Sequence, residues 1–145
     1  MSIWFKPMTL QEVAQSRADT MVDHLGITFT IIGDDFLTAI MPVDRRTKQP
    51  MGIMHGGASC ALAETVASIA ANYCIDPQKK VCVGLEINTS HIKMVREGFV
   101  NATARPLHLG KSTQLWEVPI TDSDGKLVSM TRIRMAVLDR PTELK

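Results

Sequence analysis

Glu64 is the residue of this chain whose type and surroundings most clearly suggest chemistry. It carries the only formal charge between Lys48 and Asp76. Residues 57–73 around it are otherwise small, apolar or neutral polar, and this pattern predicts a helix that is buried on most sides. An unpaired carboxylate in such a helix would be strongly destabilising. Glu64 is therefore expected to be paired, neutralised or used as a base or nucleophile.

The residues just before this helix could supply the other half of a site. His55, Gly56 and Gly57 lead into it, and glycines let a ligand approach the backbone closely. Free N–H groups and the positive end of the helix dipole could hold a developing oxyanion there. The alternative is a glycine turn that only starts the helix.

Polar residues share one face of the helix with Glu64. Ser68 and Asn72 follow it at i+4 and i+8, and Cys60 precedes it at i−4. Ser68 could hydrogen-bond the carboxylate or a water molecule held by it, and that water could attack a carbonyl group held at the helix start. In the alternative, backbone and hydroxyl groups simply satisfy a core carboxylate.

A β-rich run over residues 81–91 is expected to meet the helix. Its alternation places Val83, Leu85, Ile87 and His91 on one face. His91 would then either line the site near Glu64 or be a satisfied core histidine.

The loop over residues 108–113 offers a glycine, a lysine and two hydroxyl groups. Such a loop could present backbone N–H groups and a cation to a pyrophosphate, or it could be a solvated turn. Its spacing is not that of a P-loop.

Several function classes are poorly supported. The four histidines are scattered without metal-ligand spacing, and neither a GxSxG elbow nor a GxGxxG loop is present, so we expect no metal and no cofactor. A net charge of +1 without a basic run argues against nucleic acid. The chain lacks a secretory pattern and a long apolar span, and its three cysteines fit reduced core thiols, so we expect a cytoplasmic protein with no membrane association.

The predicted elements are arranged as α+β. A capping box, Thr9 to Glu12, starts a short helix that runs to about Asp19. A hairpin over residues 27–32 and 36–43, the long helix, and strands at 81–92, 99–105, 113–121 and 126–138 follow. The last four strands read as an antiparallel meander with a turn at Glu97 and Gly98, and Pro119 predicts an edge position or a bulge.

This order predicts one domain over residues 1–145, with an N-terminal helical segment at 1–25 and a frayed tail at 140–145. A curved antiparallel sheet wrapped around the long central helix would explain why that helix is so apolar. Such an architecture is the hotdog fold.

Four segments of the chain resemble hotdog-fold acyl-CoA thioesterases of the PaaI-like group. They are residues 49–57, Ala63 with Glu64, residues 83–91 and residues 106–110. Residues 41–50 are similar to a subgroup that hydrolyses 1,4-dihydroxy-2-naphthoyl-CoA in menaquinone synthesis and to its paralogue that proofreads enterobactin synthesis.

The resemblance implies roles for individual residues. Glu64 would be general base or nucleophile, and Gly56 would donate its N–H to the thioester oxygen. His55 and Gln49 would position substrate and water, Ser68 would orient Glu64 or the water, and His91 would line the site. Residues that match ligand-contacting positions, largely for the CoA portion, are Gly84, His91, Ile92, Lys93, Met94, His108, Leu109, Gly110, Lys111, Ser112 and Thr113.

The resemblance also implies a homodimer or homotetramer with active sites between subunits. Ser90 and Lys93 depart from the Asn and Arg frequent in the subgroup, and Lys93 loses bidentate phosphate geometry. The sequence thus predicts metal-free hydrolysis of an acyl-CoA, with an aromatic acyl group of the dihydroxynaphthoyl or benzoyl type. The rivals are a hotdog enoyl-thioester hydratase or dehydratase and an acyl-CoA-binding protein without catalysis.

Overall fold

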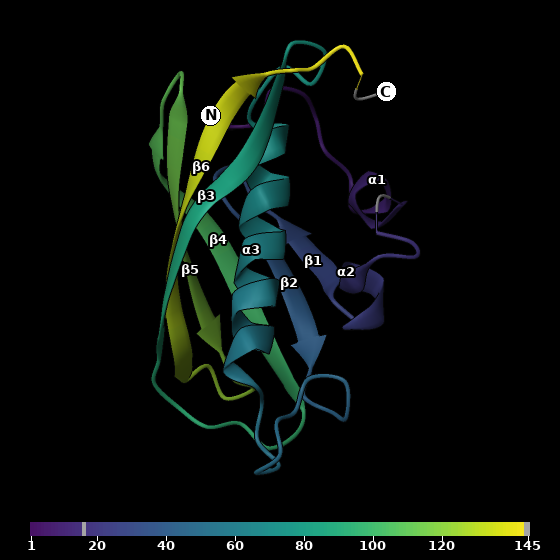
Figure 1. Ribbon diagram of the computed structural model, residues 1–145, viewed down its shortest axis with the longest axis vertical. Coiled ribbons are helices and arrows are strands. Elements are labelled where there is room, and N and C mark those ends of the chain that lie inside the picture. The colour runs from purple at the N-terminus through teal and green to yellow at the C-terminus, as the bar shows by residue number, and fades with distance from the viewer. Residues whose placement is uncertain (16, 144–145) are drawn as a thin grey trace.

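The computed structural model describes residues 1–15 and 17–143 and consists of one curved sheet crossed by one long helix (Figure 1). The elements are α1 Leu10–Gln15, α2 Met21–His24, β1 Thr28–Ile32, β2 Leu37–Pro42, α3 Gly56–Tyr73, β3 Lys80–His91, β4 Phe99–Leu109, β5 Thr113–Thr121 and β6 Leu127–Asp139. The six strands lie in the order β1-β2-β4-β5-β6-β3, and every pair is antiparallel. The predicted fold class, α+β with the sheet curved around a central helix, is confirmed.

Helix α3 packs on the sheet through one face only. Its buried residues recur in adjacent pairs once per turn, at Ala58 and Ser59, Leu62 and Ala63, Val66 and Ala67, and Ala70 and Ala71. They contact buried strand residues such as Trp116, Ile120 and Ile133 in a single core. The other face, from Cys60 to Tyr73, is only half-buried. The prediction of a helix buried on most sides is therefore wrong for a single chain, because the sheet curls around one side of α3.

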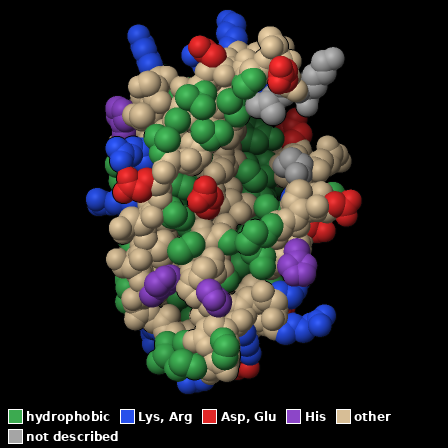
Figure 2. All heavy atoms as spheres, in the orientation of Figure 1, with side chains coloured by type: hydrophobic (Ala, Val, Ile, Leu, Met, Phe, Trp, Pro, Cys, Tyr) green, Lys and Arg blue, Asp and Glu red, His purple; other side chains and the backbone are tan. Residues whose placement is uncertain are grey.

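The open face of α3 remains rich in apolar residues. Ala61, Ile69 and Tyr73 lie on it, next to Cys60 and Glu64. Figure 2 shows the corresponding face of the molecule, where hydrophobic side chains gather over the helix and the adjacent strand edge. An apolar surface of this kind next to a strand edge is typical of an association surface.

The four C-terminal strands do not form the predicted simple meander. Strands β4, β5 and β6 follow one another, but β3 pairs with β6 and β4 pairs with β2. The segment 92–98 is thus a crossover between the two halves of the sheet, and Glu97 and Gly98 are not a hairpin turn. The crossover leaves the twelve-residue strand β3 as one edge of the sheet.

A β-bulge at Leu85 changes which side of β3 meets the helix. The pairing of β3 with β6 steps from Gly84 opposite Met135 to Glu86 opposite Arg134, so Leu85 is the extra residue. Cys82 and Gly84 face α3 before the bulge, and Thr89 faces it after the bulge. The predicted row of Val83, Leu85, Ile87 and His91 is therefore broken. Val83 is 42% exposed and Leu85 58%.

The N-terminal capping box is confirmed. The Thr9 N–H donates to the Glu12 carboxylate at 3.0 Å, and the Glu12 N–H donates to the Thr9 hydroxyl at 3.2 Å. The helix α1 ends at Gln15, however, earlier than the predicted end near Asp19, which adopts a left-handed φ of 58°. Residue 16 lies outside the described residues.

Pro119 lies inside the sheet, not at its edge. Strand β5 is flanked by β4 and β6, and Pro119 is opposite Met130. The pairing with β4 is interrupted between Ile120 and Glu117, since a proline has no N–H to donate to the ladder.

The C-terminal tail starts in contact with the fold, because the Arg140 N–H donates to the Lys79 carbonyl at 2.8 Å. Residues 144 and 145 of the predicted frayed tail lie outside the described residues.

In the described part of the chain, no helix is long and apolar enough to cross a membrane.

Candidate active site

The start of α3 is shaped by its N-cap residue, His55. The His55 Nδ1 accepts the N–H of Gly57 at 2.8 Å, and its carbonyl accepts the N–H of Ala58 at 2.9 Å. The N–H of Gly56 has no hydrogen-bond partner among the described residues. An unpaired N–H at the positive end of an eighteen-residue helix is a ready donor for an oxyanion.

The loop before α3 is held rigidly, which fixes the position of Gln49. The buried Thr47 hydroxyl donates to the Pro42 carbonyl at 2.7 Å, and the His55 N–H donates to the Thr47 carbonyl at 2.8 Å. At the loop's entrance the Arg46 guanidinium hydrogen-bonds Asp44 and lowers the pKa of that carboxyl to about 2. Gln49 is therefore presented by backbone bonds and not by a mobile loop.

A cavity of about 290 Å³ opens beside this helix start. Six of the predicted site residues line it, namely Gln49, Gly56, His91, Ile92, Lys93 and Met94. The His91 ring lies so close to Gly56 that a Cβ there would be 2.9 Å from Nε2. The remaining lining residues are Ile53, Met54, Ser59, Val95 and Val128, and among them the sequence offers only Met54, as a residue of either the acyl pocket or the core. Ile53 lies within the glycine-flanked segment before α3, the one signal that could have found it.

Lys93 at the mouth of this cavity is paired with Asp122. The hydrogen bond from the lysine lowers the pKa of the Asp122 carboxyl, so the aspartate stays ionised beside it. Lys93 is 40% exposed and is therefore oriented by its partner while still open to an anionic ligand.

Glu64 lies elsewhere, on the open face of α3 beneath the edge strand β3. A Cβ on Gly84 would come within 2.5 Å of the Glu64 Oε1, so only glycine allows this approach of the strand to the carboxylate. Glu64 is half-buried and forms no ion pair with any described residue. The structure thus joins Glu64 to Gly84, while Ser68 lies one turn further along the same helix face.

Glu64 and Gly56 do not meet within one chain. They are eight residues apart in a continuous helix, which corresponds to about 12 Å along its axis. A single carbonyl group bound at the helix start would therefore be out of reach of the same chain's Glu64.

The hairpin loop over residues 108–113 is a third, separate location. The Gly110 N–H donates to the Thr113 carbonyl at 2.9 Å, and the Ser112 carbonyl accepts the Val137 N–H at 2.8 Å. In Figure 1 this β4–β5 hairpin lies at the opposite end of the molecule from the start of α3.

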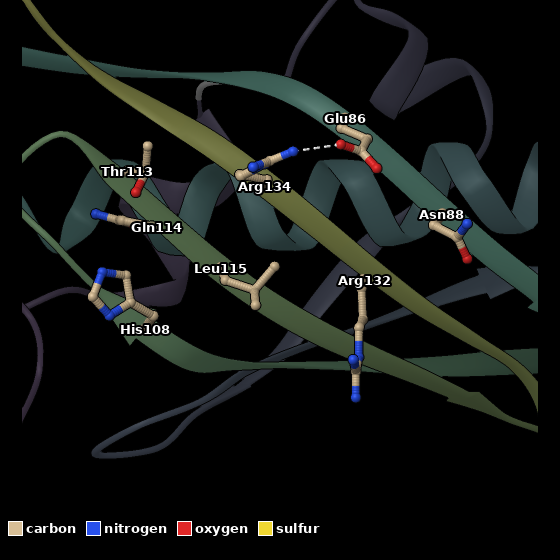
Figure 3. A pocket seen from close by; sticks show the side chains of 8 residues that line it. All are labelled: Glu86, Asn88, His108, Thr113, Gln114, Leu115, Arg132 and Arg134. Carbon is tan, nitrogen blue, oxygen red and sulfur yellow. Dashed lines mark hydrogen bonds and ion pairs between the residues drawn. The ribbon is translucent and has the colours of Figure 1, made fainter.

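A second cavity, of about 600 Å³, flanks this hairpin on the sheet face that points away from α3. Figure 3 shows its lining residues, with Arg134 paired to Glu86 at 2.6 Å. They are Glu86, Asn88, His108, Thr113, Gln114, Leu115, Arg132 and Arg134. The sequence predicted only His108 and Thr113 of this set. The described residues contain no cluster of His, Cys, Asp or Glu suited to a metal ion.

Comparison with known proteins decides the family. Residues 51–129 match the family model described as the thioesterase superfamily. The chain is 46% identical to the 1,4-dihydroxy-2-naphthoyl-CoA hydrolase of Escherichia coli K12, covering 94% of this chain and 99% of that protein. It is likewise 46% identical to the proofreading thioesterase EntH of Cronobacter sakazakii, covering 94% and 98%.

This chain belongs to the thioesterase superfamily. It is a thioester hydrolase with the hotdog fold, as the sequence predicted. The superposition with a crystal structure of a mutant thioesterase from Pseudomonas aeruginosa gives a TM-score of 0.95 at 42% identity, over 96% of this chain and 100% of that one. A thioesterase structure from Haemophilus influenzae gives 0.94 at 40% identity, over 99% of both chains.

The contact of Gly84 with Glu64 generates a first prediction. Gly84→Ala should lower kcat on the order of tenfold, because the added methyl group displaces the carboxylate. It should change the free energy of unfolding by less than about 1 kcal/mol, since the flexible end of Glu64 can move aside. Thiol-release kinetics and urea unfolding measure the two effects.

Gly125→Ala is the matched control. Gly125 has a φ of 77° and open space around it, so alanine there should cost about 1 kcal/mol of stability and leave kcat unchanged. Full activity of the Gly84→Ala enzyme would contradict a role for this contact.

Proposed function

We propose that this protein hydrolyses the thioester bond of an aromatic acyl-CoA at a site built by two copies of the chain. Glu64 of one copy and the start of α3 of the other would face the same carbonyl group. The observation that carries the proposal is the separation of about 12 Å between these two groups within one chain, together with a free strand edge beside Glu64.

The free edge of β3 is suited to association of two copies. On one side no strand from the described part of the chain pairs with it, and exposed apolar side chains lie along it at Val83 and Leu85. Pairing of two β3 strands about a two-fold axis would extend the sheet and bring the open faces of the two α3 helices together. Ala61, Ile69 and Tyr73 would then be buried, which explains their apolar character.

Two-fold pairing would also unite the three separate groups of predicted residues. Antiparallel pairing places the beginning of one β3 beside the end of the other. The helix start, with Gly56 and His91, would then approach the opposite end of the second copy, where the hairpin loop over residues 108–113 lies. Lys93 and this loop could thus contact the phosphates of one CoA from two chains.

The chemistry follows from the groups that would converge. The thioester oxygen accepts the free Gly56 N–H, and the dipole of α3 stabilises the negative charge that develops on it. Glu64 takes a proton from water, the water oxygen bonds to the carbonyl carbon, and the C–S bond breaks. The proton then passes to the CoA thiolate, giving the free acid and the thiol. Direct attack by the carboxylate, through an anhydride that water opens, gives the same products.

An aromatic acyl group is supported by the relatives and by the lining of the cavity. The Escherichia coli relative is named a 1,4-dihydroxy-2-naphthoyl-CoA hydrolase. Ile53, Met54 and Met94 give the cavity beside Gly56 an apolar, adaptable wall.

We infer a cytoplasmic enzyme, since the three cysteines are free thiols, as expected in a reducing compartment.

Removal of the Glu64 carboxylate tests the mechanism. Glu64→Gln preserves the shape of the side chain but not its basicity, and kcat should fall on the order of 10² or more. Glu117 alternates with the buried Trp116 and Val118 and so lies on the sheet face away from α3. Glu117→Gln is therefore the control and should retain wild-type kcat. A Glu64→Gln enzyme with near wild-type turnover would rule out this mechanism.

A panel of substrates tests the acyl group and the rival functions. Thiol release from benzoyl-CoA and naphthoyl-CoA should exceed release from aliphatic CoA esters in kcat/KM by on the order of tenfold. Formation or loss of an enoyl-CoA absorbance band without free thiol would indicate a hydratase instead. Tight binding of the esters without thiol release would indicate a binding protein.

A further inference from the structure

The side chain of Asn72 bonds the free edge of β3 as a neighbouring strand would. Cys82 is opposite Val137 of β6, but the Val137 N–H points away and donates to the Ser112 carbonyl. Cys82 and Val137 therefore form a pair without mutual hydrogen bonds, and the N–H and C=O of Cys82 point to the open edge. The Asn72 Oδ1 accepts that N–H at 2.9 Å, and its Nδ2 donates to that carbonyl at 3.0 Å.

The carboxamide also ties this edge to the helix face that carries Glu64. The second N–H of Asn72 donates to the Ser68 carbonyl at 2.9 Å, one helical turn beyond Glu64. Both donors of Asn72 are thus used within the chain, and none is left for a substrate. The Asn72 side chain therefore links α3 rigidly to β3.

The link lies where β3 is paired on one side only, just before an irregularity in that pairing. Gly84, whose backbone touches the Glu64 carboxylate, is two residues after Cys82 and one residue before the bulge at Leu85. A bulge interrupts the ladder with β6, and no strand among the described residues pairs with the other side of β3. Asn72 therefore attaches the strand on the side that β6 does not cover.

We propose that Asn72 is a positioning residue of the active site: by clamping Cys82 it holds the Gly84 backbone against the Glu64 carboxylate. The claim rests on the proposed function, in which that carboxylate is the base or nucleophile. Because the N–H and C=O of Cys82 are bonded to Asn72, a second β3 strand would pair only with backbone groups beyond Cys82.

The test compares Asn72→Ala and Asn72→Asp with the control Thr65→Ala. Asn72→Asp keeps the shape and the acceptor but loses both donors. Thr65 lies beside Glu64 in α3, and its hydroxyl donates at 2.7 Å to Ala61 of the same helix, so its removal does not affect β3. We expect kcat to fall on the order of tenfold in both Asn72 variants, with KM within about twofold of wild type, and to stay unchanged in Thr65→Ala.

Two readouts separate positioning from a general structural role. Hydrogen exchange of the Cys82 amide should accelerate on the order of tenfold in Asn72→Ala and not in Thr65→Ala. In a Glu64→Gln background, Asn72→Asp should cause no further loss of kcat, because its effect acts through the carboxylate.

The contrary results are equally specific. Unchanged kcat in both Asn72 variants, or the same tenfold loss in the Glu64→Gln background, would overturn the positioning role. If the wild-type protein releases no thiol, the proposed function fails and the positioning role fails with it. An unchanged Cys82 amide in Asn72→Ala would then also overturn the clamp itself.

Discussion

The close approach of the β3 backbone to the Glu64 carboxylate is the constraint on which the rest of the site depends. A Cβ at Gly84 would lie 2.5 Å from Oε1, so at this point the strand and the helix approach each other through backbone and carboxylate. This contact requires a glycine in an edge strand, a bulge immediately after it, and a helix whose neighbouring face is left open. The glycine and the bulge would each weaken an ordinary sheet. Together the three features place a carboxylate at a free strand edge.

The rest of the fold supplies the rigidity that this arrangement needs. The buried residues of α3 pack on Trp116 and its neighbours in the core. This packing fixes the position of the helix on the sheet. His55 and the loop before it fix the helix start, and Asn72 fixes the strand near the helix end. The open face of α3 and the edge of β3 then remain exposed, as the proposed two-chain site requires.

The sequence predicted the elements well because they depend on local signals. The capping box of Thr9 and Glu12, the hairpin around Gly33 and the long apolar helix are each set by residues close together in the chain. The family motifs likewise placed the residues around Gly56 and His91 in one cavity. The pairing of β3 with β6 could not be predicted in this way, because it depends on how the crossover passes the helix.

The same limit applies to the site. The bulge at Leu85 reverses the alternation of β3, and Gly84 just before it is the one residue of the strand that could have indicated it. In the sequence, Arg132 and Arg134 have only the alternating pattern of ordinary strand residues. Their place in a cavity beside the hairpin loop depends on the tertiary structure. The hydrogen bonds of Asn72 depend on the tertiary position of an edge strand, whereas sequence spacing indicated only that it shares a face with Glu64.

The central claim is that one active site takes Glu64 from one chain and Gly56 with Gln49 from another. Co-expression of Glu64→Gln and Gln49→Ala chains with different affinity tags yields a hybrid dimer that can be purified away from the two parent dimers, each assayed alone for its low activity. If the site is shared, the hybrid has one intact site and should show about half the wild-type activity per dimer. A hybrid no more active than its parents would contradict the account, because each chain would then carry its own complete site.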